Sequence, residues 1–484
     1  MQLDVSALGI DLAALAPVLI VGGAAMMVLL LGLVVDAKNG WVLVTFSLAG
    51  LMAAAWSVLA MGGGRVAFGG MLAVDGLSTF TGLLSVGVAA LAVLLSASYV
   101  ERVGLAQPEY YGLLLFGASG MLVMAGATNL ITLIIGLELL SLSLYVLAGF
   151  ARTRLTSEEA ALKYFLLGSF ALALLIYGTA LIYGEVGSLD YADIARVLRE
   201  QGASTTALLG FGLLLVGFGF KLSLVPFHMW VPDVYEGAPT PVTAYMAVGT
   251  KAVVFAVLLR LLVTAFPTLS GEWTVILSAM AAVTVVVANV AAVAQSNLKR
   301  LLGYSAISHA GYLMMAVVAD GSLGSGAVLF YLVAYTAMNF GAFAVLVAVG
   351  EGREERLALE DYAGLARRSP WLAAAMAFFM LSLGGAPFTA GFLAKLYVFS
   401  AAVQGGFLWL AVVGAITSVV AFYYYLRVVV AMYMAEPREK LVLQRPSLSM
   451  AAVVVLALLL TLQMGILPGL SPSMSVLSAL LPGI

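Results

Sequence analysis

The sequence predicts an all-α polytopic membrane protein, and three features of its 484 residues carry that prediction. Hydrophobic residues make up 63% of the chain and charged residues only 10%, with a mean hydropathy of +1.11. A soluble protein of this length needs far more charge on its surface. Apolar runs of roughly 20 residues, the length that crosses a bilayer as a helix, follow one another with short polar joints. The alternating ten-residue strands of a β-barrel are absent.

The apolar runs predict about 14 transmembrane helices within a single membrane domain, residues 1–484. The predicted helices are 12–35, 40–61, 75–99, 110–127, 129–150, 160–183, 205–231, 240–266, 272–294, 300–319, 324–349, 371–404, 407–434 and 447–468. The stretch from Ser188 to Glu200 is too polar to span and predicts a short surface helix. The 51 glycines fit helices that pack closely in lipid, where small residues let backbones approach.

Composition excludes several kinds of site. The chain has no cysteine, which removes iron–sulfur clusters, thiolate metal sites and c-type haem attachment. No glycine-rich phosphate loop follows a predicted strand, so no nucleotide site is expected. We therefore expect no cofactor or metal bound by this chain and no nucleic-acid partner; the lipid bilayer and protons are its expected surroundings.

Basic residues are distributed unequally between the connecting loops, and this predicts the orientation. The odd-numbered loops hold Lys38, Arg102, Arg152, Arg154, Lys299, Arg300, Arg353, Arg356, Arg367, Arg368, Arg438, Lys440 and Arg445. The even-numbered loops hold only Arg65, Arg196 and Arg199, with Arg260 near a helix end. The odd loops are therefore expected to face the cytoplasm, with both termini on the opposite side.

Five ionisable residues lie deep within predicted spans, where charges are rare, costly and usually face a cavity or one another. They are Glu138, Lys221, Lys251, His309 and Lys395. A buried lysine or histidine of this kind can take up and release protons. A chain of Glu, Lys and His across several helices therefore predicts a proton relay. Glu138 is expected to pair with one of the lysines, and a static ion pair is the structural alternative.

Two further basic residues lie nearer the helix ends. Lys163 is a few residues into its helix, so it either snorkels to the interface or joins the relay. Arg427 lies late in helix thirteen, where snorkelling is favoured. His228 follows Pro226 toward a loop and is interpreted as a helix-end or structural residue.

Two predicted helices are interrupted by proline within similar short sequences. Helix seven contains "LSLVPF" (222–227) and helix twelve contains "LSLGGAPF" (381–388), each beside a central lysine. Proline breaks a helix, and in lipid the freed backbone groups survive only where protein or water satisfies them. The breaks are five helices apart, so the two helices run in opposite directions. This predicts two inverted five-helix repeats, 110–266 (helices 4–8) and 272–434 (helices 9–13), preceded by helices 1–3 in 1–109 and followed by helix 14 (447–468).

Several longer stretches resemble the antiporter-like membrane subunits of respiratory NADH:quinone oxidoreductase (complex I). They are "KLSLVPFHMWVPDVYEGAPTPVTAYMAVGTKAVVF", "EEAALKYFLLGSF", "SNLKRLLGYSAISHAGY", "YLVAYTAMNFGAF" and "GAPFTAGFLAKLYVF". The first of these stretches is most similar to the N-type branch of the family. Lys395 also favours the N-type branch, because M-type subunits carry a glutamate on helix twelve.

The resemblance implies proton translocation driven by quinone reduction in neighbouring subunits. It implies that Glu138 pairs with Lys221 and that Lys251 is the connecting lysine of the relay. It also implies that His309 lies on the central axis and that Lys395 is the terminal lysine toward the exit on the far side of the membrane. Lys163 falls in the "ALKYF" block, and Thr336 and Asn339 are implied to line the axis. NADH, FMN, Fe–S clusters and quinone would then belong to other subunits. The implied partners are M-type antiporter-like and small K-, J-, A- and H-type subunits in a bacterial inner (plasma) membrane.

Two other functions remain open from the sequence. A subunit of an Mrp-type multi-subunit Na+/H+ antiporter would share the fold. Only the subgroup-specific sequence of the motifs separates this alternative from a complex I subunit, and it favours complex I. Gene neighbours coding for NADH-binding and Fe–S subunits would discriminate between them. A scaffold with static charge pairs is the third alternative, which loss of pumping in normally assembled point mutants would contradict.

Overall fold

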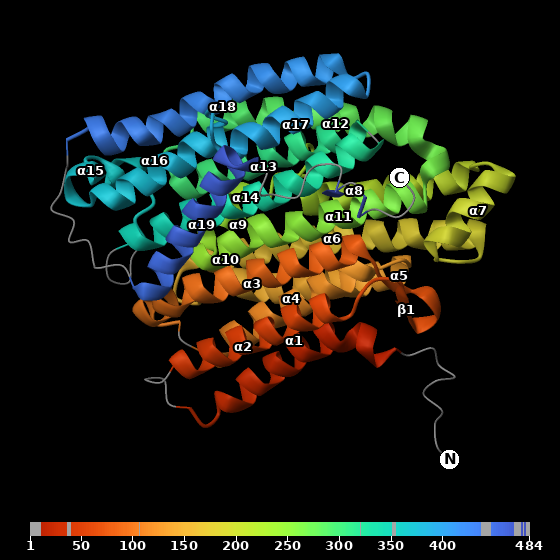
Figure 1. The fold of residues 1–484 in the computed structure, drawn as a ribbon, viewed down its shortest axis with the longest axis horizontal. Coiled ribbons are helices and arrows are strands. Elements are labelled where there is room, and N and C mark those ends of the chain that lie inside the picture. The colour runs from red at the N-terminus through yellow and green to blue at the C-terminus, as the bar shows by residue number, and fades with distance from the viewer. Residues whose placement is uncertain are drawn as a thin grey trace.

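The computed structural model describes residues 11–35, 40–105, 107–319, 321–350, 355–436, 447–468, 476–477 and 479–480. Long helices lie side by side along one direction, from α1 and α2 at one side to α18 at the other (Figure 1). Five residues used to predict the orientation, Lys38, Arg353, Arg438, Lys440 and Arg445, lie outside the described residues.

Each predicted span corresponds to one or two observed helices, which confirms the all-α membrane fold. The unbroken spans are α1 (Leu12–Leu31), α2 (Trp41–Ala60), α3 (Gly76–Val103), α4 (Pro108–Gly126), α5 (Leu130–Ala148), α6 (Leu155–Val186), α12 (Ser270–Val293), α13 (Leu298–Val318), α14 (Gly321–Val349), α18 (Leu408–Met434) and α19 (Leu448–Ile466). The eighth span is α10 (Thr240–Tyr245), a π-helical segment (Met246–Thr250) and α11 (Lys251–Thr264). Among the described residues, 12 helices are long and apolar enough to cross a membrane.

Helices seven and twelve are interrupted where the prolines predicted. The seventh span is α8 (Thr205–Leu222) followed by α9 (Val231–Gly237), and the twelfth is α16 (Pro370–Gly384) followed by α17 (Ala390–Gln404). The chain leaves α8 through a left-handed residue, Ser223 (φ 64°), and leaves α16 through Gly385 (φ 92°). The Val225–Pro226 peptide bond between the halves of the first break is cis.

The helices after α3 pack in two corresponding groups. α4 packs on α5 as α12 packs on α13, and α6 contacts both halves of the first break as α14 contacts both halves of the second. This correspondence matches a repeat with an offset of five helices. The exact domain boundaries stay a prediction.

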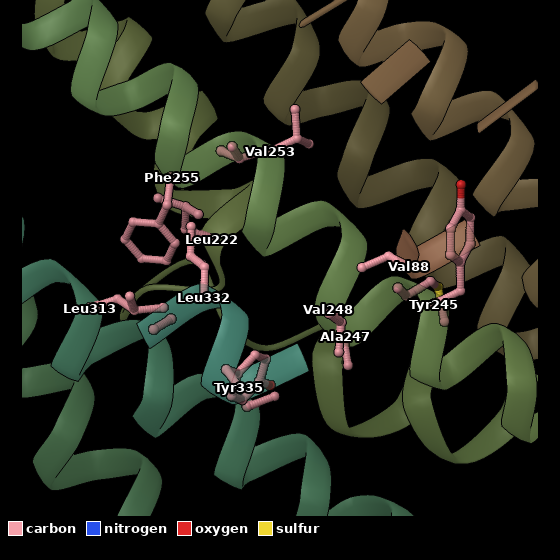
Figure 2. Packing of buried hydrophobic residues seen from close by; sticks show 14 of the residues in the cluster. Val88, Leu222, Tyr245, Ala247, Val248, Val253, Phe255, Leu313, Leu332 and Tyr335 are labelled. Atoms are coloured by element: carbon pink, nitrogen blue, oxygen red, sulfur yellow. The ribbon is translucent and has the colours of Figure 1, made fainter. Parts of the chain in front are cut away.

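The most buried helices lie at the centre of the bundle. In α10–α11, α13 and α14, 94% of the most apolar window is buried, against 28% in α1 and α2, which expose apolar side chains. Leu222, Val253, Phe255, Leu313 and Leu332 belong to one continuous core at the first break (Figure 2). Polar groups inside this core therefore lie far from the exposed surface of the chain.

Short elements occupy the two ends of the bundle. The surface helix predicted at 188–200 is α7 (Tyr191–Gln201), which lies at the same end as the antiparallel strands β1 (Arg65–Ala67) and β2 (Leu72–Val74) (Figure 1). α15 (Leu365–Arg368) lies at the opposite end. The remaining short segments are 3-10 turns at Phe68–Gly70, Pro267–Leu269 and Leu359–Tyr362. The even-numbered loops that hold β1, β2 and α7 thus lie at the opposite end from the odd-numbered loop that holds α15.

Candidate proton-transfer site

Lys221, in the last turn of α8 before the break, is held by neutral groups of α5. Its ammonium donates to the Ser141 hydroxyl at 2.7 Å and to the Tyr145 hydroxyl at 3.3 Å. It also lies 5.2 Å from the centre of the Tyr145 ring, a cation–π distance. The side chain is buried, with 4% of the residue exposed.

Glu138 lies on the same helix as these partners, but it forms no direct ion pair with Lys221 within 4.0 Å in the described part of the chain. Ser141 and Tyr145 follow it at intervals of three and four residues, so all three share one helical face. Its Oε1 is buried, and no described group of the chain forms a hydrogen bond with it. The two charges still interact through space. The expected close pair between Glu138 and Lys221 is therefore replaced by a longer-range interaction, because the Lys221 ammonium donates its hydrogen bonds to hydroxyls of α5.

Lys251 lies at the point where the π-helical segment ends and α11 begins. Its ammonium is 3.5 Å from the hydroxyl of Ser223, the left-handed residue that ends α8, and 6.0 Å from the centre of the Tyr235 ring. The residue is 1% exposed. The eighth span thus brings its lysine to the break of the seventh.

His309, in the middle of α13, bonds two phenols. Its Nδ1 is 2.6 Å from the Tyr331 hydroxyl on α14, and its Nε2 is 3.2 Å from the Tyr425 hydroxyl on α18. Tyr425 also bonds the hydroxyl of Ser305, one turn earlier on α13. The imidazole is therefore placed between three helices of the second group.

Lys395, on α17, bonds α16, the first half of its own broken helix, directly. Its ammonium donates to the carbonyl of Gly384, the last residue of α16, and to the Ser418 hydroxyl, both at 2.8 Å. It lies 5.1 Å from the centre of the Tyr312 ring. The lysine thus satisfies a backbone carbonyl that the break removes from the helix.

Lys163 lies apart from these buried groups. Its ammonium pairs with Glu159 and with Asp233 of α9, both at 2.6 Å, and its side chain is 39% exposed. Arg300 pairs with the same Asp233 at 2.7 Å and with Glu236 at 2.8 Å. A cavity of about 170 Å³ lies beside this ion-pair group. Asp233 was not singled out from the sequence, where it is one of many loop carboxylates.

Asn289, in the C-terminal part of α12, was also missed, although it is the single amide in an apolar run, "AAVTVVVANVAAV". It is fully buried, and its amide contacts the Tyr312 hydroxyl at 3.2 Å and the Tyr424 hydroxyl at 3.1 Å. It therefore lies between the surroundings of His309 and those of Lys395.

The remaining predicted residues have mainly local partners. Thr336 and Asn339 are buried on α14 and bond carbonyls one turn earlier. Arg427 donates to the carbonyls of Val293 and Gln295, at the end of α12. His228 is half-buried between α8 and α9. Arg260, predicted near a helix end, is buried in α11 and paired with Asp75 at 2.6 Å.

Glu355, in the loop after α14, forms a cluster that the sequence did not indicate. It accepts hydrogen bonds from the Tyr99 hydroxyl at 2.7 Å, from the backbone N–H of Thr240 at 3.1 Å and from Lys299 at 3.2 Å. Arg154 also pairs with it, at 3.3 Å. This carboxylate therefore joins the ends of α3, α10 and α13.

Taken together, the fold and these buried groups define a class: an antiporter-like membrane protein, with two helices broken beside buried lysines. Comparison with known proteins assigns it to a family. The family model described as "NADH:quinone oxidoreductase/Mrp antiporter, TM" matches residues 127–421. The NADH-quinone oxidoreductase subunit N of Trichlorobacter lovleyi is 44% identical over 468 residues, which cover 96% of this chain and 95% of the relative. The corresponding subunit of Chloroflexus aggregans is 46% identical over 408 residues, 83% of each chain. The chain belongs to the NADH:quinone oxidoreductase/Mrp antiporter membrane-subunit family.

Solved structures agree with this assignment. A chain of respiratory complex I from Thermus thermophilus with bound aureothin superposes with a TM-score of 0.80 at 39% identity, covering 95% of this chain and 99% of the other. A chain of the Mrp complex from Dietzia sp. superposes with a TM-score of 0.82 but is only 20% identical, covering 97% of each chain. The second likeness concerns the fold alone.

Proposed function

We propose that this chain is a proton-translocating membrane-arm subunit of NADH:quinone oxidoreductase, of the translocase class, whose protons move through a Glu/Lys/His relay coupled to quinone reduction in neighbouring subunits. One observation carries the proposal. Lys221, Lys251 and Lys395 are buried, and in the described part of the chain each contacts neutral hydroxyls, carbonyls or aromatic rings and no carboxylate within 4.0 Å. A buried lysine without a fixed counter-ion can exist with or without its proton, as a proton carrier must.

The geometry supports a sequence of transfers along the bundle. Movement of Glu138 toward or away from Lys221 would favour or disfavour the charged ammonium, since separating an ion pair in a low-dielectric site is worth several kcal/mol. The proton would then pass to Lys251 beside Ser223, to His309 between its two phenols, and to Lys395 at the second break. Lys163, with its exposed ion pairs, would exchange protons with the water phase.

The same proposal includes the surroundings of the chain. It would lie in a bacterial inner membrane with its odd-numbered loops in the cytoplasm and both termini on the other side. Its partners would be M-type and small K-, J-, A- and H-type membrane-arm subunits. NADH, FMN, Fe–S clusters and quinone would be bound elsewhere in the complex; among the described residues no group of three or more His, Asp or Glu side chains is placed to hold a metal.

Substitution in the assembled complex tests the relay. We expect Lys221→Ala and Glu138→Gln to lower the number of protons pumped per quinone reduced in reconstituted vesicles. The matched control is Arg196→Ala, which removes an exposed cation paired with Asp193 on the surface helix α7. Pumping that stays at the wild-type ratio in both Lys221→Ala and Glu138→Gln would show that these residues do not carry protons.

A further inference from the structure

A chain of contacting polar side chains runs from His309 to Lys395. Tyr425 bonds His309, and the centre of its ring lies 4.4 Å from that of Tyr424. Tyr424 bonds Asn289, and Asn289 bonds Tyr312. Tyr312 contacts Thr417, and the next residue, Ser418, accepts a hydrogen bond from Lys395. Every member except Asn289 and the two end groups is a hydroxyl, which can accept one proton while it releases another.

The orientation of the Asn289 amide is fixed by its third contact. One end of the amide lies 2.7 Å from the backbone carbonyl of Val285. A carbonyl oxygen only accepts hydrogen bonds, so this end must be the NH2 group. The same NH2 group donates its second hydrogen to the Tyr312 hydroxyl, and the amide oxygen accepts from Tyr424.

The direction of the neighbouring hydrogen bonds follows from this orientation. Because Asn289 donates to Tyr312, the Tyr312 hydroxyl is left to donate to Thr417, at 3.3 Å. Thr417 directs its own hydrogen to the Val413 carbonyl at 2.8 Å. The hydrogen bonds from Tyr424 onward therefore point one way and end on the backbone of α18.

An amide in this position cannot pass a proton as a hydroxyl does. Accepting a proton on its oxygen and releasing one from its nitrogen would leave an imidic acid, which must be reversed before a second transfer. We propose that Asn289 is a positioning residue that interrupts the side-chain path between His309 and Lys395 and holds the Tyr312 ring against the Lys395 ammonium. Protons then cross between these two groups only when water bridges them. This inference depends on the proposed function, because it needs His309 and Lys395 to carry protons.

Two substitutions of similar size test the interruption in the whole complex reconstituted into vesicles. Asn289→Asp places a carboxyl group in the chain, which can accept a proton on one oxygen and release one from the other. Asn289→Leu removes the amide without supplying a carrier. We expect passive proton conductance, measured without substrate under an imposed potassium diffusion potential, to rise several-fold in Asn289→Asp and to stay at the wild-type level in Asn289→Leu. Equal conductance in both variants would overturn the inference, since a purely structural role would affect them alike.

A second variant keeps the inference testable if Asn289→Asp does not assemble. Tyr424→Phe keeps the ring and removes the hydroxyl that donates to Asn289. If no proton uses this path, pumping per quinone reduced is retained; loss of pumping in assembled complex would overturn the inference. Lys395→Ala separates the two proposals. Unchanged pumping in Lys395→Ala contradicts the proposed function, whereas reduced pumping together with equal conductance of the Asn289 variants contradicts this inference alone.

Discussion

The hydroxyl of Thr284 on α12 accepts a 2.9 Å hydrogen bond from the backbone N–H of Val225, within the break between α8 and α9. An interrupted helix leaves backbone groups that lipid cannot satisfy. Thr284 is fully buried, so a neighbouring helix supplies the acceptor that the broken helix lacks. At the second break, the Gly391 N–H similarly meets the Ser382 hydroxyl at 3.3 Å.

Replacing Thr284 with valine keeps the shape of the side chain and removes the acceptor. The Val225 N–H is then left unsatisfied, and we expect a loss of about 1–3 kcal/mol of stability. The measurement is the unfolding midpoint of the purified subunit in detergent. Thr81→Val is the matched control, because the buried Thr81 hydroxyl has no hydrogen-bond partner in the part of the chain that the structure describes. Equal destabilisation by both substitutions would show that the hydrogen bond to Val225 is not what matters.

Two aspartates that begin helices face arginines in different surroundings. Asp75 caps α3 and pairs with Arg260, whose side chain is 2% exposed, whereas Asp11 caps α1 and lies 3.5 Å from the exposed Arg65. Asparagine also caps helices, so an Asp-to-Asn change removes mainly the charge. Losing the partner of a buried charge is strongly destabilising, while exposed pairs contribute little.

We therefore expect Asp75→Asn to lower the free energy of unfolding by roughly 2–3 kcal/mol. This is no more than the smallest cost usual for breaking a fully buried ion pair, because the Asp75 side chain is 23% exposed. Asp11→Asn should change the free energy of unfolding by less than about 1 kcal/mol. Unfolding midpoints of the two variants in the same detergent give the comparison. A similar midpoint for both would mean that Arg260 is adequately solvated without its partner.

The membrane fold and its broken helices were predictable because lipid imposes them. An apolar run long enough to span must be helical, and a proline beside a lysine at membrane depth must interrupt it. Both breaks, the surface helix α7 and the burial of Lys221, Lys251 and Lys395 were confirmed.

The partners of the buried charges were not predictable in the same way. Sequence spacing places Glu138 and Ser141 on one face of α5, but it does not show which of them the Lys221 ammonium meets. Asn289 and Glu355 act through residues more than twenty positions away, at Tyr312 and Lys299. Such contacts depend on how helices rotate against one another, which the apolar pattern of an almost entirely hydrophobic helix does not specify.

Lys163 offers a test of function that is separate from stability. Its ion pairs with Glu159 and Asp233 are partly exposed, so Lys163→Met should change stability by less than about 1 kcal/mol. Asp233 also keeps its pair with Arg300. If Lys163 exchanges relay protons with water, pumping per quinone reduced falls in Lys163→Met and recovers in part in Lys163→Arg. Full pumping in the methionine variant would remove Lys163 from the relay.

Glu355 predicts a pH dependence of stability outside the membrane-spanning helices. Burial alone would raise the pKa of its carboxyl, but Lys299, the hydrogen bonds from Thr240 and Tyr99, and Arg154 together lower that pKa from 4.5 to about 2. A carboxyl whose pKa is lower in the folded state stabilises the fold at pH values above its unfolded pKa. This contribution declines as the pH falls below 4.5 and is lost by about pH 2.

The size of the contribution follows from the shift, on the order of 3 kcal/mol when Glu355 is fully ionised. We expect Glu355→Gln to be destabilised by a constant amount between pH 6 and 8, roughly in this range. Its difference from the wild-type chain should narrow only below about pH 4.5. Unfolding midpoints in detergent across pH measure this difference, with the exposed Glu109→Gln as the control that should match wild type throughout. A difference that instead varied between pH 6 and 8 would mean that another titrating group, and not the Glu355 carboxylate, stabilises this cluster.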